Sequence, residues 1–431
     1  RRFGTCPSSS SLLWIQTAQE IGEILRLANE TGIPVTPRGA GSGLAGGAVP
    51  LEGGVVLSCE RMDRILEIDE QNMVAVVEPG VVTNDLCQTV AEQGLFYAGY
   101  PMSVETSFVG GNVACNAGGA KVVKYGSTAA HVLGMEVVFP TGEVVQLGGK
   151  RRKDSSGYSM LRLLVGSEGT LGIFTQIILS LIPHPGRTAD LLVPFPSVSA
   201  AMGAVSKVMM TSGAPPSAVE FIDSVSVRYC SDYTNASIPF ADRAGAYLIV
   251  QLEGKSKNEL AEAYEKAGEA CLEHGGLEVF VADNRHASDR LWYMRRNWLE
   301  ALKAADPYVG TGDIVVPISQ IPRMMEEIEA ISQEYHIDIP CAGHAADGNI
   351  HPAVMKPAEI TVKSWKPLME EILSRVAVRA AELGGAVSGE HGIGFLKKGL
   401  LGQTKRDEVA IMRRVKDALD PNGILNPGKI F

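Results

Sequence analysis

Three glycine-dense loops constrain the fold of this chain more than any other feature of its sequence. The first, PRGAGSGLAGG at 37–47, has five glycines in its last nine positions; the others lie at 101–127 and in GSEGTLGI at 166–173. Glycine lets backbone N–H groups approach a ligand closely because it lacks a Cβ and tolerates positive φ. Ordering three such loops costs conformational entropy, so we expect a bound ligand between them.

The first loop also contains a spacing typical of dinucleotide-binding proteins. Gly41, Gly43 and Gly46 form GxGxxG, which a Rossmann-type site needs at the start of a helix. Pro50 and further glycines follow at once, so we expect no helix to begin there. We therefore expect this loop to bind a nucleotide in another way than a Rossmann-type site. NAD binding at this loop and a plain flexible loop are the alternatives.

Hydrophobic periodicity indicates a chain of the α+β class. Residues 18–30 place apolar side chains on one helical face, and 133–147 alternate as a hairpin that turns at Thr141-Gly142. Amphipathic helical stretches become frequent after residue 186, for example at 258–273 and 321–334. We therefore predict a cofactor-binding domain, a second α+β domain and a C-terminal segment that returns toward the cofactor. The expected bounds are 1–187, 188–383 (with the loop 343–352) and 384–431.

Composition excludes several classes of protein. The chain of 431 residues is 45% hydrophobic, 20% charged and has a net charge of −10, which disfavours nucleic acid or an anionic membrane surface as the main partner. No apolar run approaches the ~18 residues of a membrane helix. The chain opens on Arg1, so an upstream targeting segment could be missing. We expect a cytoplasmic location in a bacterium, with membrane association only through a partner, and a mitochondrial one in a eukaryote.

The seven cysteines are scattered and form no CxxC pair. They therefore predict neither a disulfide framework nor a zinc ribbon, and they indicate a reducing compartment. An iron–sulfur cluster would need clustered thiolates, so we expect none within this chain. The cysteines are at positions 6, 59, 87, 115, 230, 271 and 341.

Two of the eight histidines lie in one ten-residue loop. GHAADGNIHP places His344 and His351 around a turn-forming Asp-Gly-Asn, and SGEHGIG adds the pair Glu390-His391 between glycines. Two imidazoles and a carboxylate suit Zn²⁺, Mn²⁺ or Fe²⁺. The alternative is that each histidine is a structural residue with satisfied hydrogen bonds.

The combined motifs resemble a known family. PRGAGSGLAGG, VEPGV at 77–81, GGNVACNAGGAKVVKYG and GSEGTLGI are similar to the FAD-binding domain of the vanillyl-alcohol oxidase superfamily. Within it, the chain resembles the branch of D-lactate dehydrogenases, glycolate oxidase flavoprotein subunits and D-2-hydroxyglutarate dehydrogenases. The resemblance implies an FAD-binding domain, a substrate (cap) domain and non-covalent FAD, since no attachment residue is evident. It implies that FAD is lined by Arg38, Gly39, Ala40, Gly41, Ser42, Gly43, Leu44, Pro101, Glu105, Thr106, Gly110, Gly111, Asn112, Asn116, Gly118, Gly119, Glu168, Gly169, Ile173 and Asn426.

The same resemblance assigns roles to the histidine loops. It implies that His344, His351 and Glu390 hold the metal and that His391 is the catalytic base. It also places Arg295 on the substrate carboxylate, a task that suits the planar fork of a guanidinium. The neighbouring Arg296 and a plain surface role for Arg295 are the alternatives. Substrate contacts are expected from Arg295, His344 and Asn349.

The chain departs from the relatives that act on D-2-hydroxyglutarate. Those enzymes carry a lysine where this sequence has Thr311, and often a hydroxyl residue where it has Leu299. A second substrate carboxylate would lack a partner there, and burying an unpaired charge is costly. The sequence therefore favours lactate, glycolate or another monocarboxylate.

The function expected from these features is oxidation of a small D-2-hydroxy acid to its 2-oxo acid. Electrons would leave to an external acceptor, such as an electron-transfer flavoprotein or an iron–sulfur subunit. We expect a homodimer or part of a hetero-complex. The alternatives are an electron-transfer or scaffold flavoprotein subunit, a D-2-hydroxyglutarate dehydrogenase, and a metal-dependent hydrolase.

Overall fold

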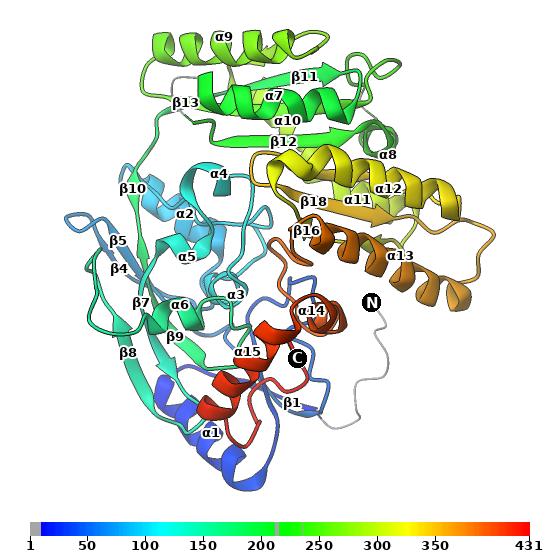
Figure 1. The fold of residues 1–431 in the computed structure, drawn as a ribbon. Helices are drawn as coiled ribbons and strands as arrows, with labels where there is room; N and C mark the ends of the chain where they lie inside the picture. Colours follow the sequence, from blue (N-terminus) through cyan, green and yellow to red (C-terminus); the bar gives the residue numbers. More distant parts are fainter. Residues whose placement is uncertain (1–9, 212–214, 236) are drawn as a thin grey trace. The chain divides into compact units, whose positions relative to one another are not determined.

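The computed structural model describes residues 10–211, 215–235 and 237–431 and divides into two compact units (Figure 1). Unit 1 contains the described residues up to Gly119, together with Tyr125–His184 and Glu390–Phe431. Unit 2 contains Ala120–Lys124 and Pro185–Gly389. Apart from the short insert Ala120–Lys124, the chain changes unit at 184/185 and at 389/390. Cys6 lies outside the described residues.

Unit 1 contains three sheets. A parallel sheet has the order β1-β3-β2, a larger antiparallel sheet has the order β4-β5-β9-β7-β8, and β6 pairs with β10. The strands are β1 (Ser10–Trp14), β2 (Val35–Arg38), β3 (Gly54–Ser58), β4 (Ile65–Asp69), β5 (Val74–Val77), β6 (Leu95–Phe96), β7 (Val132–Val138), β8 (Val144–Gly148), β9 (Ile173–Ser180) and β10 (Ile182–Pro183). The helices are α1 (Ala18–Thr31), α2 (Thr83–Ala91), α3 (Val109–Cys115), α5 (Thr128–His131), α6 (Met160–Leu164), α14 (Lys398–Thr404) and α15 (Arg406–Leu419), and α4 (Val122–Tyr125) spans the boundary with unit 2.

Helix α1 shows how local sequence sets these elements. Thr17 accepts a hydrogen bond from the backbone of Glu20, whose side chain returns to the Thr17 backbone, so a capping box starts the helix. Gly32 ends it with φ of 69°, a left-handed conformation that glycine adopts without strain. The predicted helix at 18–30 is confirmed, and so is the predicted hairpin, which β7 and β8 form.

The C-terminal segment is part of the core of unit 1. Ile424 and Leu425 are buried in one hydrophobic cluster with Ile21 and Leu25 of α1. Leu425 also forms a parallel bridge with Val35 at the start of β2. The segment Glu390–Phe431 therefore packs within unit 1.

Unit 2 is built on one antiparallel sheet of eight strands. Its order is β14-β11-β13-β12-β17-β18-β15, and β16 also pairs with β18. The strands are β11 (Arg187–Phe195), β12 (Ala218–Asp223), β13 (Ala246–Gly254), β14 (Phe280–Ala282), β15 (Gly310–Thr311), β16 (Ile314–Val315), β17 (Cys341–His344) and β18 (Asn349–Val354). The helices are α7 (Val198–Thr211), α8 (Ser224–Thr234), α9 (Lys257–Glu273), α10 (Arg285–Arg296), α11 (Trp298–Ala305), α12 (Ile321–Tyr335) and α13 (Val362–Glu382), with a 3₁₀ turn at Ile318–Gln320.

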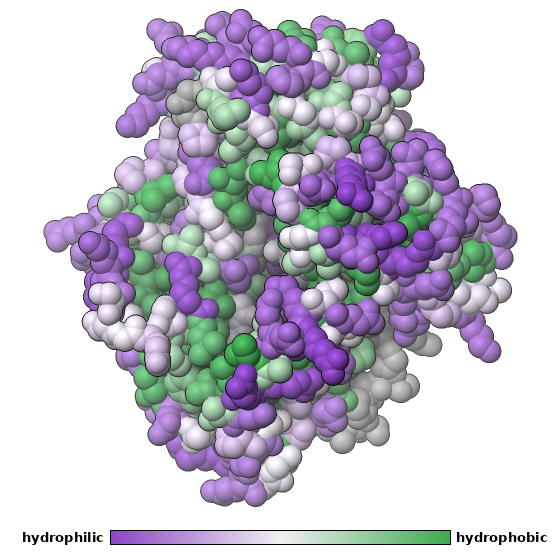
Figure 2. All heavy atoms as spheres, in the orientation of Figure 1, coloured by the Kyte–Doolittle hydropathy of each residue, from purple (hydrophilic) through white to green (hydrophobic). Residues whose placement is uncertain are grey.

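Helices α7 and α9 pack against β11 and β13 of this sheet (Figure 1). Ser256 begins α9 with a capping box, and the helix buries Leu260, Ala267 and Cys271. Its solvent-facing side is hydrophilic in Figure 2, as the predicted amphipathic pattern requires. The helices predicted at 258–273 and 321–334 are thus confirmed as α9 and α12.

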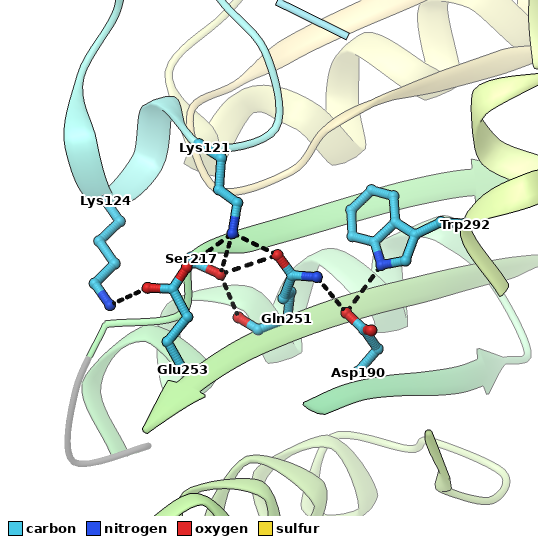
Figure 3. A network of polar contacts seen from close by, with 7 residues as sticks. All are labelled: Lys121, Lys124, Asp190, Ser217, Gln251, Glu253 and Trp292. Carbon is cyan, nitrogen blue, oxygen red and sulfur yellow. Dashed lines mark hydrogen bonds and ion pairs between the residues drawn. The ribbon is translucent and has the colours of Figure 1, made fainter. Parts of the chain in front are cut away.

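The short segment Ala120–Lys124 belongs to unit 2 because of a polar network (Figure 3). Lys121 Nζ donates to Ser217 Oγ at 3.0 Å, Gln251 Oε1 at 2.5 Å and Glu253 Oε1 at 2.8 Å. Lys124 Nζ binds the other oxygen of Glu253 at 2.6 Å. Burial lowers the pKa of Lys121, and the charge of Glu253 opposes that effect. The segment that follows the second glycine-rich loop is therefore held by side chains of the second unit.

Candidate active site

The first glycine loop follows β2 and forms no helix, as predicted. Gly41 has φ of 71°, and a Cβ there would lie 2.4 Å from the Arg38 guanidinium. Gly43 and Gly111 face open space, because a Cβ on either residue would have no other described atom within 4 Å. A Cβ on Gly39 would lie only 3.5 Å from the backbone nitrogen of Gly111, so the first two glycine loops approach each other. Bare backbone around open space fits a bound pyrophosphate.

The second loop is fixed by its asparagines. Asn112 Nδ2 donates to Thr83 Oγ1 at 2.8 Å in a buried position, and Asn116 Oδ1 accepts from Ser127 and from the backbone of Ala129, both at 2.9 Å. These side chains hold the loop in shape, so any contact they make with FAD is in addition to that role.

The other predicted FAD residues of this region are either glycines packed closely against neighbouring residues or exposed side chains. Gly119 packs so closely on the Tyr100–Pro101 backbone that a Cβ would lie 2.8 Å from the Tyr100 oxygen. Gly110 is as tightly packed on Pro79. Glu105 and Thr106 are exposed in the turn before α3.

Asn426 joins the first and third glycine loops within unit 1. Its Nδ2 donates to the backbone oxygens of Gly47 at 3.1 Å and Glu168 at 2.8 Å. Its backbone nitrogen donates to Val35 O at 2.7 Å. Because Asn426 is buried, it holds these two glycine loops together from the protein interior.

Glu168 has a position that the sequence did not indicate. Its two carboxylate oxygens accept from the backbone N–H groups of Ile393 and Gly394, both at 2.7 Å. Burial raises the pKa of Glu168, and these two hydrogen bonds oppose the shift. Predicted as an FAD residue, Glu168 thus holds the loop that carries Glu390 and His391.

Glu390 and His391 open the C-terminal segment of unit 1. Their side chains are 14% and 22% exposed, and His391 Nε2 lies 3.6 Å from Glu390 Oε1. Glu390 directly follows Gly389, the last residue of unit 2.

The two loop histidines lie together in unit 2. They belong to the hairpin β17–β18, where His344 pairs with Asn349 and Ala342 pairs with His351. Since side chains alternate along a strand, this register puts both imidazoles on one face as diagonal neighbours. Their ring centroids are 5.4 Å apart, and both side chains are buried. Each can present a ligand nitrogen within 4.8 Å of the other, so the pair fits a divalent metal.

A buried carboxylate accompanies His344. Glu220 of β12 pairs in register with His344 of β17, and His344 Nδ1 lies 2.5 Å from Glu220 Oε1. The other oxygen of Glu220, Oε2, forms an ion pair with Arg295 NH2 at 2.8 Å but has no hydrogen-bond partner among the described residues. Burial alone would raise the pKa of Glu220, but the charges of His344 and Arg295 outweigh it and hold that pKa below its ordinary value.

A second buried carboxylate accompanies His351. Asp313 Oδ1 lies 3.8 Å from His351 Nδ1 and accepts from Asn349 Nδ2 at 2.9 Å. Its Oδ2 accepts from Ser388 Oγ at 2.7 Å and from the Gly389 backbone at 3.2 Å. Asp313 therefore fixes Ser388 and Gly389, the two residues that directly precede Glu390.

Asn349 and Arg295 are placed differently from each other. Both hydrogens of Asn349 Nδ2 are engaged, by Asp313 Oδ1 and by Ile314 O, so the predicted substrate contact would involve its Oδ1. Arg295 is buried, and its Nε has no hydrogen-bond partner among the described residues. Arg296 is exposed and stacks over Trp292, so only Arg295 joins the buried cluster.

Sequence reasoning missed both Glu220 and Asp313 as parts of this site. The available signal was a carboxylate among apolar residues, Glu220 in AVEF and Asp313 in TGDIVVP. A charged residue inside a buried strand needs a partner, so each such residue predicts one.

Comparison with known proteins agrees with this architecture. Residues 10–148 match the model of an FAD-binding domain, and 184–430 match that of the C-terminal domain of FAD-linked oxidases. The fold is also similar to that of 4-ethylphenol oxidase from Gulosibacter chungangensis (TM-score 0.76, 21% identity, covering 97% of this chain and 88% of that one). The chain belongs to the FAD-linked oxidase family and is an FAD-dependent oxidoreductase, which confirms the predicted resemblance and fold class.

Curated relatives match nearly the whole chain. A glycolate oxidase subunit of Bacillus subtilis is 38% identical over 96% of this chain and 87% of its own length. D-lactate dehydrogenase of Anaerostipes hadrus is 38% identical over 96% and 88%. D-2-hydroxyglutarate dehydrogenase of Xanthomonas citri is 32% identical over the same shares.

The described cysteines form neither a disulfide nor a thiolate site. All six are free, and burial raises the pKa of Cys59, Cys115 and Cys271 to about 12. Within the described part of the chain, no helix is long and apolar enough to cross a membrane.

Proposed function

We propose that this protein oxidises a small monocarboxylic D-2-hydroxy acid, D-lactate or glycolate, to the 2-oxo acid. The observation that carries the proposal is the buried pair His344–His351, flanked by Glu220 and by Arg295. The relatives named above act on glycolate, D-lactate and D-2-hydroxyglutarate, three acids that share a carboxylate beside a CH–OH group.

The proposed metal ligands are His344, His351 and Glu390, and Zn²⁺, Mn²⁺ and Fe²⁺ all suit this set. A metal held by these residues would polarise the substrate hydroxyl, and bound FAD would supply the hydride acceptor. His391 takes the hydroxyl proton as general base. Arg295 binds the substrate carboxylate through donors that Glu220 does not occupy.

The surroundings of Arg295 favour a monocarboxylate. Lys303, the nearest lysine along α11, is paired with Glu300 at 2.5 Å, and Arg296 is exposed. Thr311 and Leu299 provide no charge. A distal carboxylate would therefore lack a dedicated cation, which is costly in a buried pocket.

The electrons pass on to an external acceptor. The relative from Bacillus subtilis is named as a subunit, so an electron-transfer flavoprotein or iron–sulfur subunit is the proposed acceptor. The cysteines of the described residues are free and have raised pKa values, so they offer no cluster ligands. They also offer no reactive thiolate to flavin, so we propose that FAD is non-covalent.

Anaerobic titration of the purified protein tests this proposal. D-lactate or glycolate should bleach the flavin absorbance at lower concentration than D-2-hydroxyglutarate, and L-lactate should not bleach it. Acid precipitation should leave the flavin in the supernatant. Preferential bleaching by D-2-hydroxyglutarate would contradict the substrate assignment. No bleaching by any 2-hydroxy acid would indicate a flavoprotein subunit without substrate chemistry of its own.

A further inference from the structure

We propose that Glu220 is a positioning residue. Its one carboxylate orients both the proposed metal ligand His344 and the proposed substrate-binding Arg295. The inference rests on the proposed function and adds a residue that no sequence motif indicated. Glu220 is fully buried in β12, where each of its two oxygens holds a different partner.

The contact with His344 selects the nitrogen that can bind a metal. The antiparallel register of β12 and β17 places Glu220 opposite His344, and Oε1 lies 2.5 Å from Nδ1. A carboxylate in this position accepts the Nδ1 proton, so Nε2 is the nitrogen that would coordinate a metal. Metal-binding histidines commonly show this pairing, which fixes both tautomer and ring orientation.

The contact with Arg295 sets the orientation of the guanidinium. Glu220 Oε2 forms an ion pair with Arg295 NH2 at 2.8 Å, and neither Oε2 nor Arg295 Nε has a hydrogen-bond partner among the described residues. The rest of α10 is fixed independently, because Trp292 Nε1 donates to Asp190 Oδ1 at 2.9 Å (Figure 3). Glu220 thus contacts one nitrogen of the Arg295 guanidinium, while Asp190 anchors helix α10. The other N–H donors of Arg295 remain for a substrate carboxylate.

Stability alone gives a weak account of this arrangement. A buried ion pair roughly balances its desolvation cost, and apolar residues of similar volume often serve equally well. The neighbours of Glu220 in β12, Val219 and Phe221, are such buried apolar residues. A carboxylate that contacts both a proposed metal ligand and a proposed substrate-binding arginine instead fixes the orientation of these two side chains. It also makes the metal and the substrate carboxylate depend on the same residue.

The variant Glu220→Gln tests this role because it keeps the shape of the side chain. An amide has one oxygen and one NH₂ group, so it must turn a donor toward either His344 Nδ1 or Arg295. Glu253→Gln is the matched control, since Glu253 is a buried, lysine-paired carboxylate of the same sheet. Glu220→Asp keeps the charge but is one methylene shorter, so it can satisfy only one partner well.

The readouts are the metal dissociation constant of the FAD-loaded protein, by chelator competition with Zn²⁺ or Mn²⁺, and the KM and kcat for D-lactate. We expect Glu220→Gln to weaken metal binding by about 10- to 100-fold and to raise KM as well, with FAD content unchanged. Glu253→Gln should leave metal affinity and KM within about twofold. Glu220→Asp should restore one of the two properties more than the other.

Two results overturn the inference. If Glu220→Gln binds metal and D-lactate like Glu253→Gln, Glu220 has only a structural role. If Glu220→Gln does not accumulate as folded protein, Glu220→Asp decides, and wild-type values of both constants reject the role. A wild-type protein that binds no metal but is reduced by D-lactate rejects the metal-positioning role while the substrate assignment survives. A wild-type protein that D-lactate fails to reduce rejects the proposed function itself.

Discussion

The carboxylate of Glu168 is hydrogen-bonded to the backbone N–H of Ile393 at 2.7 Å, although 225 residues separate the two in the chain. Its second oxygen binds the N–H of Gly394 in the same way. A loop of the FAD-binding unit thereby fixes the backbone just after Glu390 and His391. The third glycine loop, which is proposed to line FAD, thus also fixes the backbone that follows the proposed base.

Glu168→Gln should loosen this loop without emptying the flavin site. Glutamine keeps one acceptor but turns an NH₂ group toward the other backbone donor, so the loop loses one hydrogen bond and gains a repulsive contact. We expect flavin reduction by D-lactate to slow by about 10-fold, which corresponds to about 1.4 kcal/mol. Stopped-flow absorbance measures the rate. Glu78→Gln, at a buried carboxylate paired with Arg64, is the control; equal rates in the two variants would deny Glu168 this role.

His391→Ala should slow flavin reduction far more than it alters binding. A positioned general base contributes about 10²- to 10⁴-fold, so the rate should fall by that factor while metal and FAD contents stay near wild type. Loss of the metal instead would make His391 a ligand. A fall of only a few-fold with both cofactors present would assign the proton to solvent.

Much of the fold follows from local sequence. The capping box of α1, the hairpin turn at Gly142 and the helix-free loop at Gly41 and Gly43 each depend on residues close in the chain, so periodicity and turn chemistry predict them. Arg295, singled out from the sequence, lies in the buried cluster.

The partners of these residues could not be predicted. Glu220 meets His344 only because β12 and β17 pair in one register, and 124 residues separate them. Sequence patterns define which face of a strand is buried but not which distant strand lies beside it. The same reason applies to Glu168, whose backbone partners are even more distant in the chain.

Lys121→Met should destabilise unit 2. The change removes the donor that Gln251 and Glu253 share, although Lys124 still pairs with Glu253, so the loss of a buried polar partner costs about 1–3 kcal/mol. We expect Tm to fall by roughly 2–6 °C. Lys124→Met, which removes a more exposed lysine from the same glutamate, should lower Tm less. Differential scanning calorimetry makes the comparison, and an equal or smaller effect of Lys121→Met would contradict the network in Figure 3.

Asp223 should make stability depend on pH. Burial raises the pKa of this carboxyl to about 6, although Ser226 and Cys341 donate backbone hydrogen bonds to it. Its folded-state pKa exceeds the unfolded value of about 3.9. The stabilisation is therefore complete below pH ~4 and is lost as pH rises through about 6.

The variant Asp223→Asn isolates this effect because asparagine does not titrate. Two pH units of difference correspond to about 3 kcal/mol, so wild-type stability relative to the variant should decline by about that amount between pH 4 and pH 7. Thermal unfolding of both proteins across this range provides the measurement. Parallel pH profiles would show that Asp223 ionises normally in the folded protein.

The central claim is that a divalent metal at His344, His351 and Glu390 acts with FAD on a D-2-hydroxy acid. Single-turnover flavin reduction by D-lactate, in protein stripped of metal by a chelator and then restored with one equivalent of Zn²⁺ or Mn²⁺, tests it most directly. We predict that stripping slows reduction by at least about 100-fold with FAD retained, that metal restores it, and that Glu390→Gln is not restored. Full-rate reduction in the metal-free protein would contradict the claim.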